Sequence, residues 1–379
     1  MTFNEVTFAA SLIGAVFLDR LARPRPTGTF LPLGRSLAGS WLLLWLTTTL
    51  FGLFLACCGN VPVSAALTLA VLALLTLASN AKYAMLGEPL LFSDLALIGA
   101  IFRHPQFYLS AVKAWQRVAV IGVAAVLLGV VAWLFVPALP PHLWGVALLL
   151  LGLATLAFSM RRSPFRHLAR SPDAIRDVER HGLLPTLLLY WSRWRDHRDP
   201  PPCEAVVRAP LPETAAPAEL VVIIQCESFA DPVELFGDDS LALPGLSFAR
   251  ANAWQWGQLE VSGFGAYTMR TEYGVLFGRS EAALGFRRYD PLLTALGESS
   301  YALPARLEPS GWRSIFAHPH DLRFYGRDRI MPAAGFAELV GEDSFAPVAA
   351  GEGRYVTDAA VADQIVSLAK AAPTRTMIY

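Results

Sequence analysis

Two threonines, an arginine and a glutamate lie inside one short glycine-bounded stretch, GAYTMRTEYGVLFG (265–278). Its pattern predicts a helix that begins near Thr268 and is closed by Gly278. Free backbone N–H groups and the helix dipole favour an anion at such a helix start. Thr268 is therefore a candidate contact for an anionic group, although threonine at this position most often caps the helix.

A second candidate, Glu227, ends the short apolar run LVVIIQCES (220–228). Continuous β-branched runs of this length are typical of strands that are buried on both faces. A carboxylate at the strand end is either a metal ligand or a cap for the next turn. A divalent metal held beside Thr268 would lower the pKa of the threonine hydroxyl and make it a nucleophile.

Two histidines and an arginine lie in the segment FAHPHDLRFYGRD, at and after the end of another strand-like run, WRSIFAH. His318 and His320 point to the same side if the chain is extended, so they are metal ligands, anion contacts or structural histidines. Arg327 has the planar fork that binds a phosphate. Together the three side chains favour an anionic ester substrate.

Strand and helix signals alternate from residue 220 onward, which predicts an α/β domain with a mostly parallel sheet. The run VTDAAVADQIVSLAKAA (356–372) forms the last expected helix, before TRTMIY. Sites in such sheets form at the carboxyl ends of the strands, where Glu227 is expected. A connector rich in proline and alanine (200–219) separates this domain from the preceding chain.

The first part of the chain is much more apolar than the rest. The whole sequence has 379 residues, 54% of them hydrophobic and 16% charged. No charged residue lies between Arg35 and Lys82 or between Arg117 and Arg161, and each interval is long enough for two spans of about 20 residues. We expect a transmembrane domain at 1–160 with helices at 6–19, 40–58, 62–79, 118–137 and 143–160, juxtamembrane helices and a linker at 161–219, and a catalytic domain at 220–379.

Two shorter apolar pieces, 90–102 and 183–191, are predicted to be interfacial or re-entrant helices. The expected spans carry no charge in their middle, which argues against a transporter. The first 160 residues carry a net charge of about +4 and the remainder about −4. There is no dense basic stripe, so nucleic acid is not an expected partner.

Four motifs in order resemble the lipoteichoic acid synthase-like branch of the alkaline phosphatase/sulfatase superfamily: IIQCESF, GAYTMRTEYGVLFG, HPHDLRFYGRD and VTDAAVADQI. The resemblance covers roughly residues 220–379, and NAKYAMLGEPLLFSDLALI (80–98) is similar to Gram-negative members. It implies a multi-pass protein of the bacterial cytoplasmic membrane whose catalytic domain is periplasmic or extracytoplasmic. The loop charges alone would place that domain in the cytoplasm under the positive-inside rule.

The resemblance also implies an activity and residue roles. A phosphoglycerol-type group would pass from a phospholipid donor such as phosphatidylglycerol, through a phosphothreonine, to a glycan or lipid acceptor. The cofactor would be a divalent metal ion: Mn²⁺ is the expected ion, and Mg²⁺ and Zn²⁺ are alternatives. Thr268, four residues before Glu272, matches the metal-bound nucleophile, Glu227 matches a metal ligand, and the substrate would contact His318, His320, Tyr325 and Arg327.

Two departures from the family pattern define the alternatives. His320 and Tyr325 replace an aspartate and a tryptophan, which leaves the substrate open. The family's later asparagine-histidine and aspartate-histidine segments, which complete its metal site, do not follow, so we expect a truncated chain that binds metal poorly. The alternatives are an inactive scaffold and a sulfatase-like hydrolase, although neither Cys203 nor Cys226 lies in the motif that sulfatases convert to formylglycine.

Overall fold

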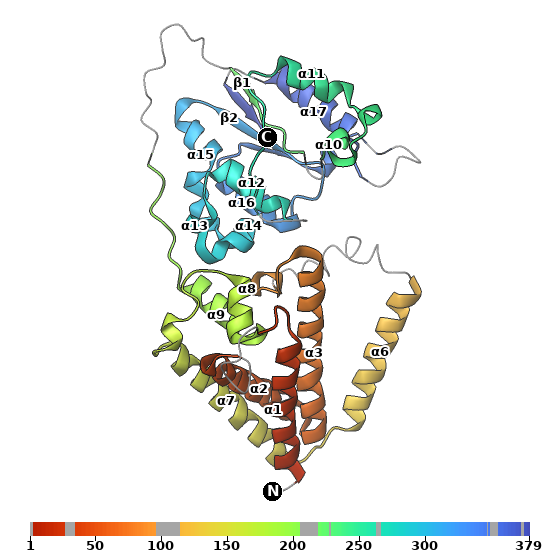
Figure 1. Ribbon diagram of the computed structural model, residues 1–379, viewed down its shortest axis with the longest axis vertical. Helices are drawn as coiled ribbons and strands as arrows, with labels where there is room; N and C mark the ends of the chain where they lie inside the picture. The colour runs from red at the N-terminus through yellow and green to blue at the C-terminus, as the bar shows by residue number, and fades with distance from the viewer. Residues whose placement is uncertain are drawn as a thin grey trace. The chain divides into compact units, whose positions relative to one another are not determined.

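The computed structural model describes residues 3–26, 35–95, 114–204, 219–226, 229–262, 267–346, 348, 355–372 and 375–379. The chain divides into two compact units, residues 1–197 and 198–379. The first unit is helical, and the second combines helices with a parallel sheet (Figure 1). The predicted fold class is therefore confirmed.

The described helices of the first unit are α1 (Phe3–Leu21), α2 (Leu37–Cys58), α3 (Val61–Leu86), α6 (Ala114–Trp133), α7 (Leu139–Met160), α8 (Ala174–His181) and α9 (Leu183–Asp196), with a 3-10 turn at Phe165–His167. Within the described residues, α2, α3 and α7 are long and apolar enough to cross a membrane. These three helices contain the predicted segments 40–58, 62–79 and 143–160. The predicted segments 6–19 and 118–137 correspond to α1 and largely to α6.

The hairpin between α2 and α3 is specified by two adjacent residues. Gly59 ends α2 with φ of 66° and donates its N–H to the carbonyl of Leu55, a left-handed conformation that suits glycine. Asn60 then caps α3 by accepting from the N–H of Val63. One residue stops the first helix and the next starts the second, so the apolar run folds back on itself.

Small residues bring α2 and α7 close together. A Cβ added at Gly52 would lie 2.5 Å from the backbone nitrogen of Leu149, and one added at Gly145 would lie 2.6 Å from the carbonyl carbon of Leu55. Glycines at such positions let two backbones approach, which is how apolar helices associate in a lipid environment. The predicted α2 and α7 spans are therefore packed partners.

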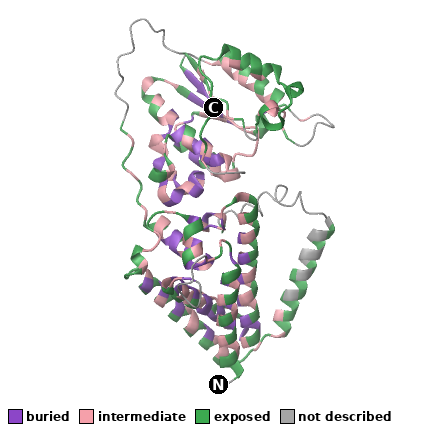
Figure 2. Ribbon diagram, in the orientation of Figure 1, coloured by how far each residue is buried: buried purple, intermediate pink, exposed green. Residues whose placement is uncertain are grey.

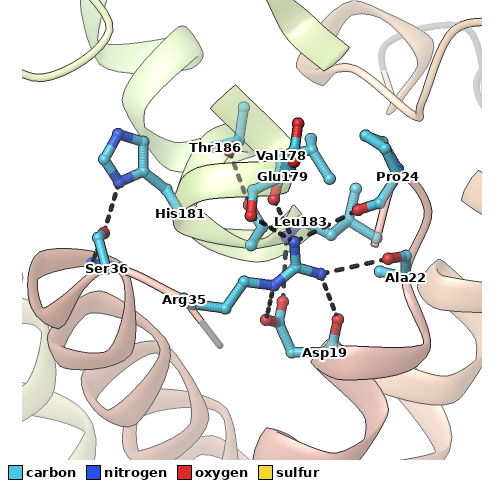
Figure 3. Close-up of polar contacts among 12 residues, drawn as sticks. Asp19, Ala22, Pro24, Arg35, Ser36, Val178, Glu179, His181, Leu183 and Thr186 are labelled. Atoms are coloured by element: carbon cyan, nitrogen blue, oxygen red, sulfur yellow. Dashed lines mark hydrogen bonds and ion pairs between the residues drawn. The ribbon is translucent and has the colours of Figure 1, made fainter. Parts of the chain in front are cut away.

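A buried arginine joins α1, α2 and α8 (Figure 3). Arg35 is 5% exposed, and its Nε donates to the Asp19 carboxylate at 3.0 Å. Its two terminal nitrogens donate to backbone carbonyls of Asp19, Ala22, Pro24, Val178 and Glu179 at 2.6 to 3.3 Å. A single guanidinium therefore donates to carbonyls at the carboxyl ends of α1 and α8, of which those of Asp19 and Val178 also accept from backbone N–H groups. We call this group of contacts the Arg35 junction.

The same junction also fixes the start of α2 and α9. Ser36 caps α2 by accepting from the N–H of Gly39, and its hydroxyl lies 2.7 Å from Nδ1 of His181. The other carboxylate oxygen of Asp19 accepts from the N–H of Leu183, the first residue of α9. The predicted apolar piece 183–191 lies in α9, where Leu183 and Leu187 are buried against Val178 of α8. Of the other piece, 90–102, residues 96–102 lie outside the described residues.

The second unit contains strands β1 (Leu220–Val222), β2 (Arg313–Ala317), β3 (Glu338–Val340) and β4 (Thr376–Ile378), and helices α10 (Pro232–Phe236), α11 (Pro244–Asn252), α12 (Thr268–Phe277), α13 (Glu281–Leu284), α14 (Pro291–Thr294), α15 (Leu303–Leu307), α16 (Arg327–Ala333) and α17 (Asp358–Ala371), with short 3-10 turns between them at 239–241, 285–289, 296–301, 308–310, 324–326 and 342–344. The strand order in the sheet is β1-β4-β2-β3, and every pair is parallel. The carboxyl ends of all four strands therefore lie at one edge.

Helices cover both faces of this sheet, because successive side chains of a strand point to opposite faces. Phe316 and Met377 pack with α12 and α16 on one face, whereas Ile315 and Ile378 pack toward α17 on the other. Figure 2 shows the buried residues of this unit gathered in the strands and in α12. The sheet thus holds α12 in a fixed place against its first face.

Candidate active site

Thr268 is the first residue of α12, and the cap position before it is Tyr267. The threonine is therefore not the N-cap that its residue type suggests, and Tyr267 makes no side-chain cap hydrogen bond. Among the described residues, the Thr268 hydroxyl has no hydrogen-bond partner. The next residues, Met269 and Arg270, are buried and anchor the first turn, which leaves a half-exposed hydroxyl at the positive end of a ten-residue helix.

Gln225 and Tyr379 connect Thr268 to the carboxyl edge of the sheet. The Gln225 side-chain amide donates to the Thr268 carbonyl at 3.4 Å, and its oxygen accepts a short hydrogen bond from the Tyr379 hydroxyl. Gln225 lies three residues beyond β1, and Tyr379 directly follows β4. The start of α12 is therefore tied to the ends of two adjacent strands, the usual place for a site in a parallel α/β sheet.

His318 lies at the same edge, directly after β2. Its backbone N–H donates to the carbonyl of Val340 at the end of β3, and its ring stacks near Phe316 with centroids 5.9 Å apart. Burial, followed by the nearby charge of Arg327, lowers the pKa of His318 to about 3. The imidazole is therefore neutral at ordinary pH, and its Nδ1 is buried without a hydrogen-bond partner among the described residues.

His320 follows in the same loop, and its ring centroid lies 6.3 Å from that of His318. Burial is again the main cause of its lowered pKa, opposed chiefly by the charge of Glu342. Two neutral imidazoles at one sheet edge can donate or accept hydrogen bonds, or bind a cation. They do not themselves supply positive charge for an anion.

The loop ends in an unusual backbone conformation at Tyr325. Its φ of 57° is in the left-handed region, which costs a non-glycine residue about 1–2 kcal/mol. Gly326 continues the left-handed turn with φ of 68°, and α16 begins at Arg327. Strained residues of this kind are common at functional sites, and the role of Tyr325 as a substrate contact stays a prediction.

Arg327 is buried rather than directed into an open surface. Its side chain is 2% exposed, and Nε and Nη2 donate to the carboxylate of Glu272 at 2.6 to 3.2 Å. Its Nη1 donates to the carbonyl of Phe324 at 3.3 Å. The role of Arg327 as a substrate ligand stays a prediction, whereas its contact with α12 is a structural fact that sequence reasoning missed.

The predicted metal ligand Glu227 lies outside the described residues. Within the residues that are described, no three histidine, cysteine, aspartate or glutamate side chains are close enough to hold a metal ion. The Thr268 hydroxyl is the described member of the predicted ligand pair. Because Glu227 is not among the described residues, the metal stays a prediction from the sequence.

A hollow of about 670 Å³ in the second unit is lined by residues of and around α10 and α11. Arg250 contributes to its lining, but this guanidinium already pairs with Asp231 at 2.6 Å and Glu234 at 3.4 Å and stacks over Trp256. Its charge is therefore neutralised by carboxylates. We place the candidate site at the sheet edge beside Thr268 and not in this hollow.

The sequence signal brought forward Thr268, His318, His320, Tyr325 and Arg327. The structure places them at the start of α12, on the loop between β2 and α16, and at the start of α16. Gln225 and Tyr379 were missed as site residues, although Gln225 lies inside the recognised run LVVIIQCES (220–228). Position at a strand end is the signal that could have found them.

These features define a protein with a helical, membrane-type unit and an α/β unit whose candidate site lies at the carboxyl edge of a parallel sheet. One curated relative is the capsular polysaccharide biosynthesis protein RkpI of Rhizobium meliloti (strain 1021), which is 30% identical over 327 residues. The match includes 80% of this chain but spans 59% of the relative's length. No family model matches the chain. No solved structure matches it either.

Proposed function

We propose that this protein is a membrane-anchored transferase that moves a phosphoglycerol-type group from a phospholipid to a cell-envelope polysaccharide. The observation that carries the proposal is the position of Thr268, at the start of α12 and tied through Gln225 to the carboxyl edge of the sheet. A hydroxyl at the positive end of a helix is suited to a phosphate ester, because the N–H groups and the helix dipole stabilise its negative charge.

Three further observations support this function. The resemblance of the motifs around Thr268 and His318 to lipoteichoic acid synthase-like enzymes suggests phosphoglycerol chemistry. The relative named for capsular polysaccharide biosynthesis suggests that the acceptor belongs to a surface polymer. The apolar helices α2, α3 and α7 would keep the protein at a membrane, where its lipid donor is found.

The proposed reaction has two displacement steps. The Thr268 hydroxyl oxygen bonds to phosphorus, the bond from phosphorus to the diacylglycerol oxygen breaks, and the threonine proton ends on the released diacylglycerol. An acceptor hydroxyl oxygen then bonds to phosphorus, the bond from phosphorus to the Thr268 oxygen breaks, and the acceptor's proton ends on Thr268. The neutral imidazoles of His318 and His320 would hydrogen-bond the substrate, and Tyr325 would border the same space.

The proposed cofactor is a divalent cation, with Mn²⁺ the expected ion. Glu227 and the Thr268 hydroxyl are the residues proposed to contact it, and it would supply charge stabilisation at the transferring group. We also propose that the protein spans the bacterial cytoplasmic membrane several times, with the second unit on the extracytoplasmic side.

The test is a comparison of Thr268→Ala with the matched variant Thr271→Ala, one turn further along the same helix. The native protein and each variant would be expressed from the native gene, and membranes containing each protein would be incubated with phosphatidylglycerol labelled in the head group. We expect Thr268→Ala to lower release of diacylglycerol about a thousandfold or more, and Thr271→Ala to keep it. Mass spectrometry should detect phosphoglycerol on Thr268 of the native protein, and unchanged turnover by Thr268→Ala would reject the function.

A further inference from the structure

Glu272 and Arg327 form a buried ion pair in the second unit. Their side chains are 4% and 2% exposed, and three donor-acceptor contacts of 2.6 to 3.2 Å join the guanidinium to the carboxylate. Such a two-pronged contact fixes the direction of both groups as well as their separation. The pair joins two elements that are 55 residues apart in the chain.

The carboxylate of this pair belongs to the same helix as the candidate nucleophile. Glu272 follows Thr268 by four residues in α12, so both are on the same face of the helix. Long helical side chains lean back toward the amino terminus, which directs Glu272 toward the turn that Thr268 begins. Holding the Glu272 carboxylate therefore holds the first turn of α12.

The guanidinium of the pair is attached to the loop that carries the predicted substrate contacts. Arg327 begins α16 and donates through Nη1 to the carbonyl of Phe324, and its guanidinium carbon lies 5.5 Å from the centre of the Tyr325 ring. This loop runs from His318 at the end of β2 to the left-handed turn at Tyr325. One ion pair therefore links the helix of Thr268 to the loop of His318 and His320.

We propose that Glu272 and Arg327 are positioning residues that set the distance between the Thr268 hydroxyl and the His318–Tyr325 loop, an inference that rests on the proposed function of Thr268. In this role Arg327 acts through Glu272. The alternative role, in which Arg327 binds the phosphate directly, makes a different prediction for kinetics.

The two roles separate in a double-mutant cycle. If the pair positions Thr268, then Glu272→Gln and Arg327→Lys each lower kcat by about a hundredfold, the effect of a displacement of roughly 1 Å, and leave KM for phosphatidylglycerol nearly unchanged. The double variant should lose no more than either single variant, because both remove the same contact. If Arg327 instead binds substrate, Arg327→Lys raises KM, Glu272→Gln does not lower kcat, and the proposal is overturned.

Hydrogen exchange gives a second readout that needs no turnover. In Glu272→Gln of the full chain, amides of α12 and of the 318–326 loop should exchange at least about tenfold faster, while those of α17 keep their native rates. Glu338→Gln is the matched control, because Glu338 forms an exposed ion pair with Arg313 in the same unit. Unchanged exchange in α12, or equal acceleration throughout the unit, would contradict a positioning role.

The proposed function and this inference fail in distinguishable ways. Full activity in Thr268→Ala rejects the proposed function, and the positioning role falls with it. Loss of activity in Thr268→Ala together with native kcat and native exchange in Glu272→Gln rejects the positioning role alone.

Discussion

The Arg35 junction allows a sharp stability prediction, because one side chain serves several buried partners. Arg35 pairs with the carboxylate of Asp19 and donates to five backbone carbonyls from α1, α8 and the turn after α1. Arg35→Met is close in length but removes every donor. It leaves a buried carboxylate and several carbonyls without this partner.

The size of the effect follows from the two kinds of partner. Removing one member of a buried ion pair typically costs about 3–5 kcal/mol, and each carbonyl left unsatisfied adds about 1–3 kcal/mol where water cannot replace the donor. We therefore expect Arg35→Met to lower the free energy of unfolding by about 5 kcal/mol or more. An isolated buried pair can often be replaced by two apolar residues without loss. The double variant Asp19→Leu, Arg35→Met should nevertheless remain at least about 2 kcal/mol less stable than the native protein, because the carbonyls still lack their donor.

The assay is unfolding of the purified protein in detergent micelles, followed by tryptophan fluorescence, for the native protein, both single variants and the double variant. Trp191 and Trp194 of α9 lie in the element whose first residue contacts Asp19, so they report on this region. Arg35→Lys serves as the control that keeps the charge with fewer donors, and it should fall between native and Arg35→Met. A double variant as stable as the native protein would refute the reasoning, because it would show that the carbonyl contacts contribute nothing.

Two other predictions concern the first unit. Burial, followed by the neighbouring charge of Arg180, lowers the pKa of His181 to about 4, so the contribution of the neutral imidazole to stability is complete above about pH 6.5 and is lost as the pH falls toward 4, by up to roughly 3 kcal/mol. Unfolding midpoints measured at pH 7.5, 5.5 and 4.5 should therefore fall more steeply for the native protein than for His181→Gln. Parallel curves for the two proteins would contradict this. Gly145→Leu should push α7 away from the α2 backbone and lower the free energy of unfolding by about 3 kcal/mol. The control is Gly129→Leu on α6, where no described atom lies within 4 Å of the added Cβ; it should leave the thermal unfolding midpoint nearly unchanged. Equal midpoints for the two variants would show that the close contact does not matter.

Much of the architecture was predictable because it depends on neighbours in the sequence. The Gly59-Asn60 pair stops one helix and starts the next through caps within four residues. The apolar run from 220 predicted a strand buried on both faces; β1 forms at its beginning, but Leu220 and Val222 are exposed. Thr268 was predicted to lie at a helix start for the same local reason, and α12 begins there.

The partners of charged and polar side chains were not predictable in this way. In the sequence Arg35 only marks the end of an uncharged interval, yet it is buried against carbonyls 143 and 144 residues away. Arg327 was predicted to contact phosphate, and the structure pairs it with Glu272. Nothing in local sequence indicates which carboxylate will approach a given guanidinium, because that depends on the packing of distant elements.

The sequence by itself therefore determined the apolar helices, the strand and helix alternation and the position of Thr268 at a helix start, since hydrophobic period, caps and glycines act over a few residues. The tertiary structure decided that Gln225 and Tyr379 tie that helix start to two strand ends, and that Glu272 and Arg327 join it to the His318 loop. These contacts exist because parallel strands bring their carboxyl ends to one edge and because burial requires each charge to find a partner within reach.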